Sequence, residues 1–509
     1  MLGIVSIGLV IVASVAIGVW GVRAARSTPD FLVASRSIVP GWNALAIAGE
    51  YVSAASVLGL AGLLVKNGVG AMWYAVGFTA GYVLVAALVA GPMRRSGAYT
   101  VPDFAEYRLG SPRLRRMCGL VVLVIMLLYL LPQFKAAGVV LELVSGIPYW
   151  IGVVGAGLVV SSTIAVGGMR SATYVQAFHY LVKLAFIAGP AVFLIVLAGP
   201  ERRDAALDPI VDADWTRPLL DLDGSGHALL ATVSVLVATT LGAMGLPHVV
   251  MRFHTVAGAR AARRVAVGVI VLLSLFYLFP VVYGLLGRIV TPDPEETDVV
   301  PVLVPGEIVP GTLGAVLTAL VAAGAFAAFL STSSGLLLAL AGGLSHDLFG
   351  GSLSRLRLGV AVGTALAVAL ALPAEGVDIN VLVGWAFAVA ASTFCPLLTL
   401  GIWWRGLTST GATAGLLVGA GSSTGAALAS VVLDLPPGPF AILLAQPALW
   451  TVPLAFATMA IASRPGSVPD WADEAVLRLH VPGRHSTGDT GAIPRARRGK
   501  GLDTARPAD

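Results

Sequence analysis

Long apolar stretches alternate along this chain with short polar or charged connections. The hydrocarbon core of a bilayer is about 30 Å thick, so a helix of roughly 20 apolar residues is needed to cross it. Apolar windows bounded by Gly, Pro and charged residues predict about thirteen such helices. They lie near residues 3–22, 43–65, 70–92, 117–144, 150–167, 174–198, 228–248, 265–289, 311–342, 358–373, 379–402, 410–433 and 440–463. The pattern therefore predicts an all-α polytopic membrane protein.

The composition supports this prediction and excludes other classes of protein. Of the 509 residues, 57% are hydrophobic and only 12% are charged, and the mean hydropathy is +0.89. A water-soluble chain of this length could not bury that much apolar surface. The two cysteines, Cys118 and Cys395, lie in or beside apolar stretches, so neither a disulfide framework nor a thiolate metal site is indicated. The net charge of +5 comes from basic residues scattered over loops and a tail, which argues against a nucleic-acid partner.

The basic residues predict the orientation of the chain in the membrane. When the predicted spans are threaded in alternation, one side collects most of the Lys and Arg residues, while the opposite loops at 201–223 and 293–298 are acidic. The positive-inside rule makes the basic side the cytoplasm. We therefore expect a multi-pass protein of a bacterial-type inner membrane, with its N-terminus outside and its C-terminus inside. The first apolar run lacks a charged n-region and a clear cleavage site, so we expect a retained span.

The spans and loops predict six successive segments. They are the first span with its cytoplasmic loop (1–42), a first set of five helices (43–198), an extracellular loop (199–227), a second set of five (228–402), two further spans (403–463) and the cytoplasmic tail (464–509). The tail is rich in Pro, Arg and Gly, with few large apolar residues after Val481, so we expect it to be disordered.

Two spans are interrupted at corresponding places in the two sets of five helices. Residues 48–56 combine Gly, Ser and a Glu inside an apolar run, and residues 239–247 hold two Gly and a Pro. Unwinding a helix inside the bilayer frees backbone groups that can bind ions and carboxylates, and it is tolerated where they face a protein-lined cavity. This pairing predicts two inverted five-helix repeats, as in LeuT-like transporters. Close helix packing at the glycines is the alternative interpretation.

Four segments resemble the sodium:solute symporter family, and within it the cation/acetate and monocarboxylate branch. These segments are residues 49–56 (GEYVSAAS), 99–104 (YTVPDF), 245–253 (GLPHVVMRF) and 345–349 (SHDLF). The segment 245–253 is the most specific for the acetate branch. The resemblance covers nearly the whole chain up to about residue 460.

This resemblance implies a sodium site between the first and eighth helices of the ten-helix core. Alignment on the motifs puts the two carbonyl ligands of the broken helix at Gly49 and Val52, and a third carbonyl ligand at Ala328. The two hydroxyl ligands fall on Ser331 and Thr332, which suits a hard cation that prefers oxygen ligands. Hydroxyls in membrane helices can also simply bond the preceding turn. Because Ser333 and Ser334 follow, a register one residue later stays open.

Ionisable residues inside predicted spans are expensive to bury and are therefore candidates for function. Glu50 lies in the first break, where it could tune the ion site, bind a proton in place of sodium or pair with a basic group. Lys135 and Glu142 are predicted to pair with neighbouring helices. His179 and Lys183 are spaced i, i+4 and could meet a carboxylate or serve the structure.

The solute carboxylate is expected to meet backbone amides at the two breaks, because helix N-termini carry positive partial charge. The loop residues Asp103 and Arg252 are expected at helix ends or gates, away from this site. Candidate solute contacts are Glu50, Tyr51, Ser53, Ser56, Thr240, Gly242 and Met244.

The function implied by the resemblance is sodium-coupled import of a small monocarboxylate, such as acetate, propionate or pyruvate, by alternating access. The partners would be Na⁺, the carboxylate and the lipid bilayer, with no cofactor. Alternatives are another small solute such as proline, coupling to protons, or a channel or transporter-derived sensor. An intramembrane enzyme is not expected, since neither His-Glu-x-x-His nor Gly-x-Gly-Asp occurs. The sequence predicts no oligomeric state.

Overall fold

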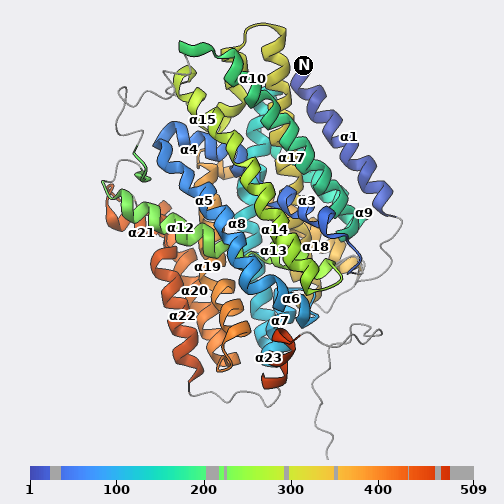
Figure 1. Ribbon diagram of the computed structural model, residues 1–509, viewed down its shortest axis with the longest axis vertical. Helices are drawn as coiled ribbons and strands as arrows, with labels where there is room; N and C mark the ends of the chain where they lie inside the picture. Colours follow the sequence, from blue (N-terminus) through green and yellow to red (C-terminus); the bar gives the residue numbers. More distant parts are fainter. Residues whose placement is uncertain are drawn as a thin grey trace, which may run out of the picture.

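The computed structural model describes residues 1–22, 36–201, 217–222, 226–291, 297–348, 353–433, 435–464 and 472–481. Every regular element within these ranges is a helix, and the helices form one elongated bundle (Figure 1). The α-helices are α1 (Leu2–Val22), α3 (Pro40–Tyr51), α4 (Leu60–Asn67), α5 (Met72–Leu84), α6 (Ala90–Ser96), α7 (Val101–Leu109), α8 (Pro112–Ser145), α9 (Tyr149–Lys183), α10 (Gly189–Leu197), α12 (Ala228–Gly245), α13 (Pro247–Arg252), α14 (Ala259–Phe276), α15 (Leu278–Val290), α16 (Val300–Ile308), α17 (Thr312–Gly342), α18 (Leu353–Ala371), α19 (Ile379–Trp403), α20 (Ser409–Val432), α21 (Pro439–Ala445), α22 (Ala448–Ser463) and α23 (Ala472–His480).

The number of membrane-spanning helices is close to the prediction. Among the described residues, ten helices are long and apolar enough to cross a bilayer, or up to twelve if each of two bent pairs is one span. The shorter apolar helix Tyr149–Ile164 coincides with the remaining predicted span, near 150–167. Exposed Leu9 and Val12 on α1 show the kind of surface that these helices turn toward lipid.

The first predicted break is present. Helix α3 ends at Tyr51, and the chain resumes as a helix at Ala55, so that α3 and the segment Ala55–Asn67 are bent by 65°. The amide of Ala54, which loses its helical partner at the bend, donates to Gln133 Oε1 on α8 at 3.1 Å. A side chain from another helix thus satisfies part of the interrupted backbone, as a break inside a membrane requires.

The second break falls at the end of the predicted segment 239–247. Helix α12 continues through Gly242 and ends at Gly245, and only Leu246 is extended before Pro247 starts α13. A Cβ on Gly242 would lie 2.6 Å from Phe387 O, and one on Gly245 would collide with Ala390 O. The chain is therefore interrupted within the predicted segment, at Leu246 before Pro247, while the two glycines serve the close approach of α12 to α19, as the alternative interpretation held.

The core of the bundle brings both repeats together around the first break. Helix α3 packs against α9 and α14, and α17 packs against α8, α9 and α1. Helix α12 packs between α5 and α19. The residues of α17 from Val321 to Gly342 are all buried, so polar side chains on this stretch must find partners inside the protein.

Part of the predicted disordered tail is helical. Helix α23 packs against α6 and α7 by burying Ala472, Ala475, Val476 and Leu479, and Arg95 Nε donates to Leu479 O at 2.5 Å. The small but regular apolar face of this helix was overlooked because the tail was judged by its average composition. Residues 465–471 and 482–509 lie outside the described residues.

The charges predicted on α8 have different surroundings. Lys135 is buried and meets Asp298 Oδ2 at 3.2 Å and Val377 O at 3.0 Å, both from other parts of the fold, as expected of a residue that pairs with neighbouring elements. Glu142 is exposed near the end of the helix. Lys135 therefore joins the segments that precede α16 and α19.

The packing role of Gly245 can be tested by adding one methyl group. Gly245→Ala should lower the free energy of unfolding by about 1–3 kcal/mol, because the new Cβ meets a backbone carbonyl that cannot move aside. Thermal unfolding in detergent measures the effect. Gly421→Ala on α20 is the control, since a Cβ there has nothing within 4 Å. Equal stability of the two variants would contradict this account of the α12–α19 contact.

Candidate functional site

The predicted ion ligands meet at the first break. Ser331 Oγ donates to Gly49 O at 2.6 Å, and Thr332 Oγ1 donates to Glu50 O at 2.6 Å, so adjacent hydroxyls of α17 bond the last turn of α3. Val52 and Ala328 are fully buried beside them. The structure therefore brings together all five residues predicted as sodium ligands.

The register along α17 is also clear in the structure. Ser334 Oγ bonds back to Leu330 O at 2.6 Å, which is the ordinary local pattern of a helical serine. Ser333 Oγ is buried without a hydrogen-bond partner. Of the hydroxyls at 331–334, those of Ser331 and Thr332 bond the broken helix, so the register with Ser333 as a ligand does not fit the break.

The side chain of Lys183 enters this group of oxygens from α9. Its Nζ donates to Val52 O at 2.7 Å, to Ser331 Oγ at 2.9 Å and to Gly49 O. Lys183 is fully buried. Three of the predicted sodium ligands thus bind an ammonium group that belongs to the chain itself, and the residues present do not leave room for a sodium ion beside it.

Glu50 forms a buried ion pair with Arg252. Arg252 Nε lies 2.7 Å from Glu50 Oε2, and Arg252 Nη1 donates to Thr173 Oγ1 at 2.9 Å. Both charged side chains are almost wholly buried. Arg252 ends the short α13 and forms a salt bridge, as expected, but the expectation that it would lie away from the site was wrong, because its side chain reaches Glu50 on α3.

Gln176 on α9 connects the ion pair to the predicted ion ligands. Its Oε1 accepts from Arg252 Nη2, and its Nε2 donates to Ser331 O at 3.0 Å. Sequence reasoning missed Gln176 and Thr173. Their spacing of three residues from each other, and of seven from Gln176 to Lys183, puts all three on one polar stripe of an apolar helix, and this signal could have identified them.

Two glycines make room for this network. A Cβ on Gly335 of α17 would collide with the carboxylate of Glu50, and a Cβ on Gly49 would collide with Gln176 O. The close approach of α3 to α9 and α17 therefore depends on these two positions.

His179 has a structural environment. Its Nε2 lies 2.7 Å from Ser14 Oγ on α1, and Ser14 also donates to Val10 O at 2.6 Å. Although His179 is one turn from Lys183, it faces α1 and not the break.

An aromatic cluster lies beside the break. Tyr51 contacts Tyr82 at 4.7 Å and Phe387 at 6.2 Å between ring centroids, and Phe387 contacts Tyr129 at 5.6 Å. Tyr129 in turn contacts His248 at 5.6 Å. The rings come from α3, α5, α8, α13 and α19, so both repeats contribute.

Several buried polar groups on the helices of this cluster have no hydrogen-bond partner within the protein. They are Tyr82 Oη, Gln133 Nε2 and both ring nitrogens of His248. Buried polar atoms are almost always satisfied, so these groups are candidates for contact with a polar ligand or water. None of the three residues was predicted from the sequence.

The residues predicted to contact solute divide into two groups. Tyr51, Ser53 and Ser56 lie at the break, where Tyr51 Oη donates to Phe78 O at 3.2 Å and Ser56 Oγ lies 3.0 Å from Tyr277 Oη. The others lie on α12: Met244 is buried, Gly242 contacts α19, and Thr240 Oγ1 is 3.4 Å from Gly77 O. The structure does not bring Thr240 to the break.

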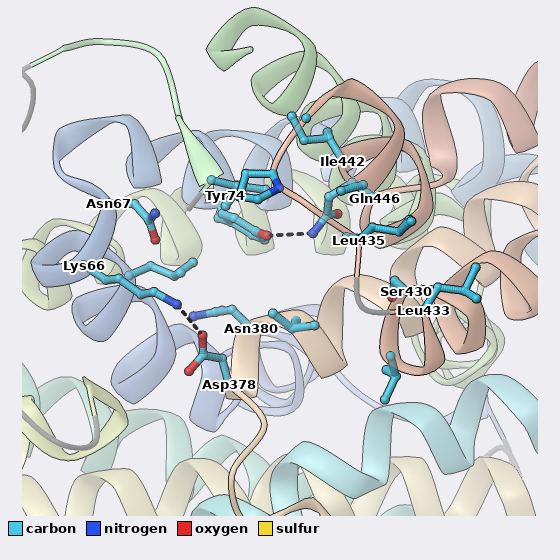
Figure 2. A pocket seen from close by; sticks show the side chains of 18 residues that line it. Lys66, Asn67, Tyr74, Asp378, Asn380, Ser430, Leu433, Leu435, Ile442 and Gln446 are labelled. Carbon is cyan, nitrogen blue, oxygen red and sulfur yellow. Dashed lines mark hydrogen bonds and ion pairs between the residues drawn. The ribbon is translucent and has the colours of Figure 1, made fainter. Parts of the chain in front are cut away.

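A pocket of about 400 Å³ lies beyond the aromatic cluster and is lined by residues of α4, α19 and α21 (Figure 2). Lys66 and Asp378 form an ion pair across it at 3.3 Å, and Tyr74 Oη accepts from Gln446 Nε2 at 3.3 Å (Figure 2). The Tyr74 ring contacts Phe78 at 6.1 Å, and Phe78 contacts Tyr51. Aromatic rings thus separate the pocket from the break.

Two solved structures are similar to this chain over most of its length. One is a Na⁺-coupled sialic acid symporter in a substrate-bound outward-open state, with a TM-score of 0.72 at 12% sequence identity, covering 92% of this chain and 98% of the other. The second is Mhp1, a nucleobase-cation-symport-1 family transporter in a closed conformation, with a TM-score of 0.53 at 14% identity, covering 88% of this chain and 98% of the other. These similarities confirm the predicted LeuT-like fold.

Residues 31–419 match the model of the Sodium:solute symporter family, and this match spans well over half of the 509 residues. The family and both structural neighbours are transporters. The branch specific for acetate and other monocarboxylates is a finer assignment that these similarities do not reach. The chain belongs to the Sodium:solute symporter family, and membership implies a solute symporter with Na⁺ as the coupling ion.

Proposed function

We propose that this protein is a secondary active symporter that imports a small monocarboxylate, such as acetate, propionate or pyruvate, across the cell membrane. The observation that carries the proposal is the set of unpartnered polar groups on the helices that form the aromatic cluster, on Tyr82, Gln133 and His248. A carboxylate offers two oxygens that accept several hydrogen bonds at once. Its binding would satisfy donors that the folded chain leaves unpaired.

The surroundings of these groups favour a small solute. The cluster is closed by Tyr51, Phe78 and Phe387, which are all buried. An apolar wall around a few polar groups is typical of a small-molecule site, and such a wall suits a solute with a short alkyl chain beside its carboxylate. The segment 245–253, which resembles the acetate branch and contributes His248, supports the same class of solute.

The broken helix and the ion pair support an alternating-access mechanism. Glu50 belongs to the first repeat and Arg252 to the second, so their ion pair links the two repeats directly. With the orientation predicted from the basic loops, α13 lies toward the cytoplasm and the pocket at Lys66 and Asp378 lies outside. We assign the Glu50–Arg252 pair to the inner gate and the aromatic layer above the break to the outer gate.

Solute uptake into proteoliposomes tests the proposed substrate class. Radiolabelled acetate and pyruvate should accumulate above the external concentration under an imposed inward cation gradient, and unlabelled propionate should compete. Proline and sialic acid serve as alternative solutes. Accumulation of either of these without carboxylate uptake would replace the proposed substrate, while movement only to equilibrium would indicate a channel.

Tyr82→Phe separates a solute contact from a structural role. Its hydroxyl has no partner in the protein, so its removal should leave thermal stability unchanged. If the hydroxyl binds the carboxylate, the apparent KM for uptake should rise roughly tenfold, because one hydrogen bond to a charged group contributes about 1.5 kcal/mol or more. Tyr283→Phe is the matched control, since that hydroxyl donates to Ile187 O at 2.8 Å and its loss should lower stability without changing KM. An unchanged KM in Tyr82→Phe would remove Tyr82 from the site.

Glu50→Gln tests the link between the repeats. It leaves Arg252 buried without its carboxylate, so we expect a loss of about 3–5 kcal/mol in stability and a strong loss of uptake. Thermal unfolding and uptake measure the two effects, with the exposed Glu142→Gln as control. The double variant Glu50→Gln, Arg252→Gln should recover stability but not uptake if the charges serve gating. Full uptake in the single variant would show that the pair has no part in transport.

A further inference from the structure

We propose that the ammonium group of Lys183 takes the place of a sodium ion at the junction of α3 and α17, so that Na⁺ does not bind there in this protein. The inference concerns the identity of the cation at this junction. It does not depend on which solute the protein carries.

The position of Lys183 Nζ shows that a sodium ion could not bind at the same place. Na⁺ is similar in size to Ca²⁺, which oxygen ligands hold at about 2.3–2.6 Å. Lys183 Nζ lies 2.7 Å from Val52 O and 2.9 Å from Ser331 Oγ, and it also bonds Gly49 O. A sodium ion bound to the same three oxygens would have to occupy the space of this nitrogen. The two cations therefore exclude each other.

The three acceptors around the nitrogen match the hydrogen-bonding capacity of an ammonium group. Ser331 gives its hydroxyl proton to Gly49 O, so toward Lys183 its oxygen acts as an acceptor. Nζ thus faces three acceptors, and only an ammonium group has three N–H donors. The site holds one positive charge that is covalently tethered to α9.

The charge balance around the break points in the same direction. In the described part of the chain, the buried charged groups joined at this break are Glu50, Arg252 and Lys183. One carboxylate already faces two cationic side chains. A sodium ion would add a third positive charge in a region without water, where unbalanced charge is expensive. The network is better balanced without the ion.

This inference separates the chain from the sodium coupling that its family implies, at this one site. If the junction is filled by Lys183, sodium coupling of transport must use other ligands in the chain. The hydroxyls of Ser331 and Thr332 would then hold the broken helix and the lysine in place. The resemblance, by contrast, assigns them as ligands of a sodium ion.

Direct binding of ²²Na⁺ to the purified protein tests the proposal without any solute. We expect Ser331→Ala to leave sodium binding of the wild type unchanged. Lys183→Ala opens the space among the oxygens and should create a sodium site, detected as added ²²Na⁺ binding and as thermal stabilisation that rises with NaCl but not with choline chloride. Lys183→Met is the matched control, because its side chain keeps most of the volume and should create no site. The double variant Lys183→Ala, Ser331→Ala should lose the added binding.

Each result of these binding measurements either supports or overturns the proposal. Sodium binding by the wild type that disappears in Ser331→Ala would overturn the proposal, since it would place Na⁺ among these oxygens while Lys183 is present. Folded Lys183→Ala that gains no sodium binding would also overturn it. Should Lys183→Ala fail to fold, the wild type and Ser331→Ala still give the answer. Failure of carboxylate uptake would count against the proposed substrate and would leave these binding results unaffected.

Discussion

A helix that is interrupted inside the membrane is the constraint on which the rest of this structure depends. Where α3 stops at Tyr51, backbone groups lose their helical partners in a region without water, and each would cost several kcal/mol if left unpaired. The protein satisfies them with side chains from three other helices: Gln133 from α8, Ser331 and Thr332 from α17, and Lys183 from α9. The packing of these helices around α3, and the glycines that allow it, follow from that requirement.

The buried charged side chains are connected to the same interrupted helix. Glu50 leaves the broken helix on one side and pairs with Arg252, while Lys183 reaches the carbonyls on the other side. Gln176 contacts both Arg252 and Ser331 and so connects the two groups. A movement that separates the repeats must break or transfer several hydrogen bonds to charged groups together, which gives the closed arrangement the cooperative character expected of a gate.

The sequence predicted the features that arise from local chemistry. The helical class follows from the apolar runs, and the first break was located because Gly, Ser and Glu interrupt such a run. Ser331 and Thr332 were placed opposite it by resemblance, and the structure brings them there. The second break falls at the end of the predicted segment 239–247, but which backbone stays helical could not be predicted, because Gly242 and Gly245 pack against Phe387 and Ala390 of α19, far away in the chain. That Glu50 could pair with a basic group was predicted, but its partner Arg252 was not, since the pair depends on a tertiary contact.

The difference between a tethered and a free cation matters for how such a site can work. A free ion binds from one side of the membrane and leaves on the other, so its gradient can drive the change between states. An ammonium group fixed to α9 cannot leave the protein, and it stabilises the contact of α3 with α17 regardless of the sodium concentration. The ammonium group supplies the positive charge that the carbonyls of Gly49 and Val52 require, but it does not exchange with ions in the solution. The junction then serves as a permanent joint between helices, and the energy for solute accumulation must enter through groups outside these oxygens.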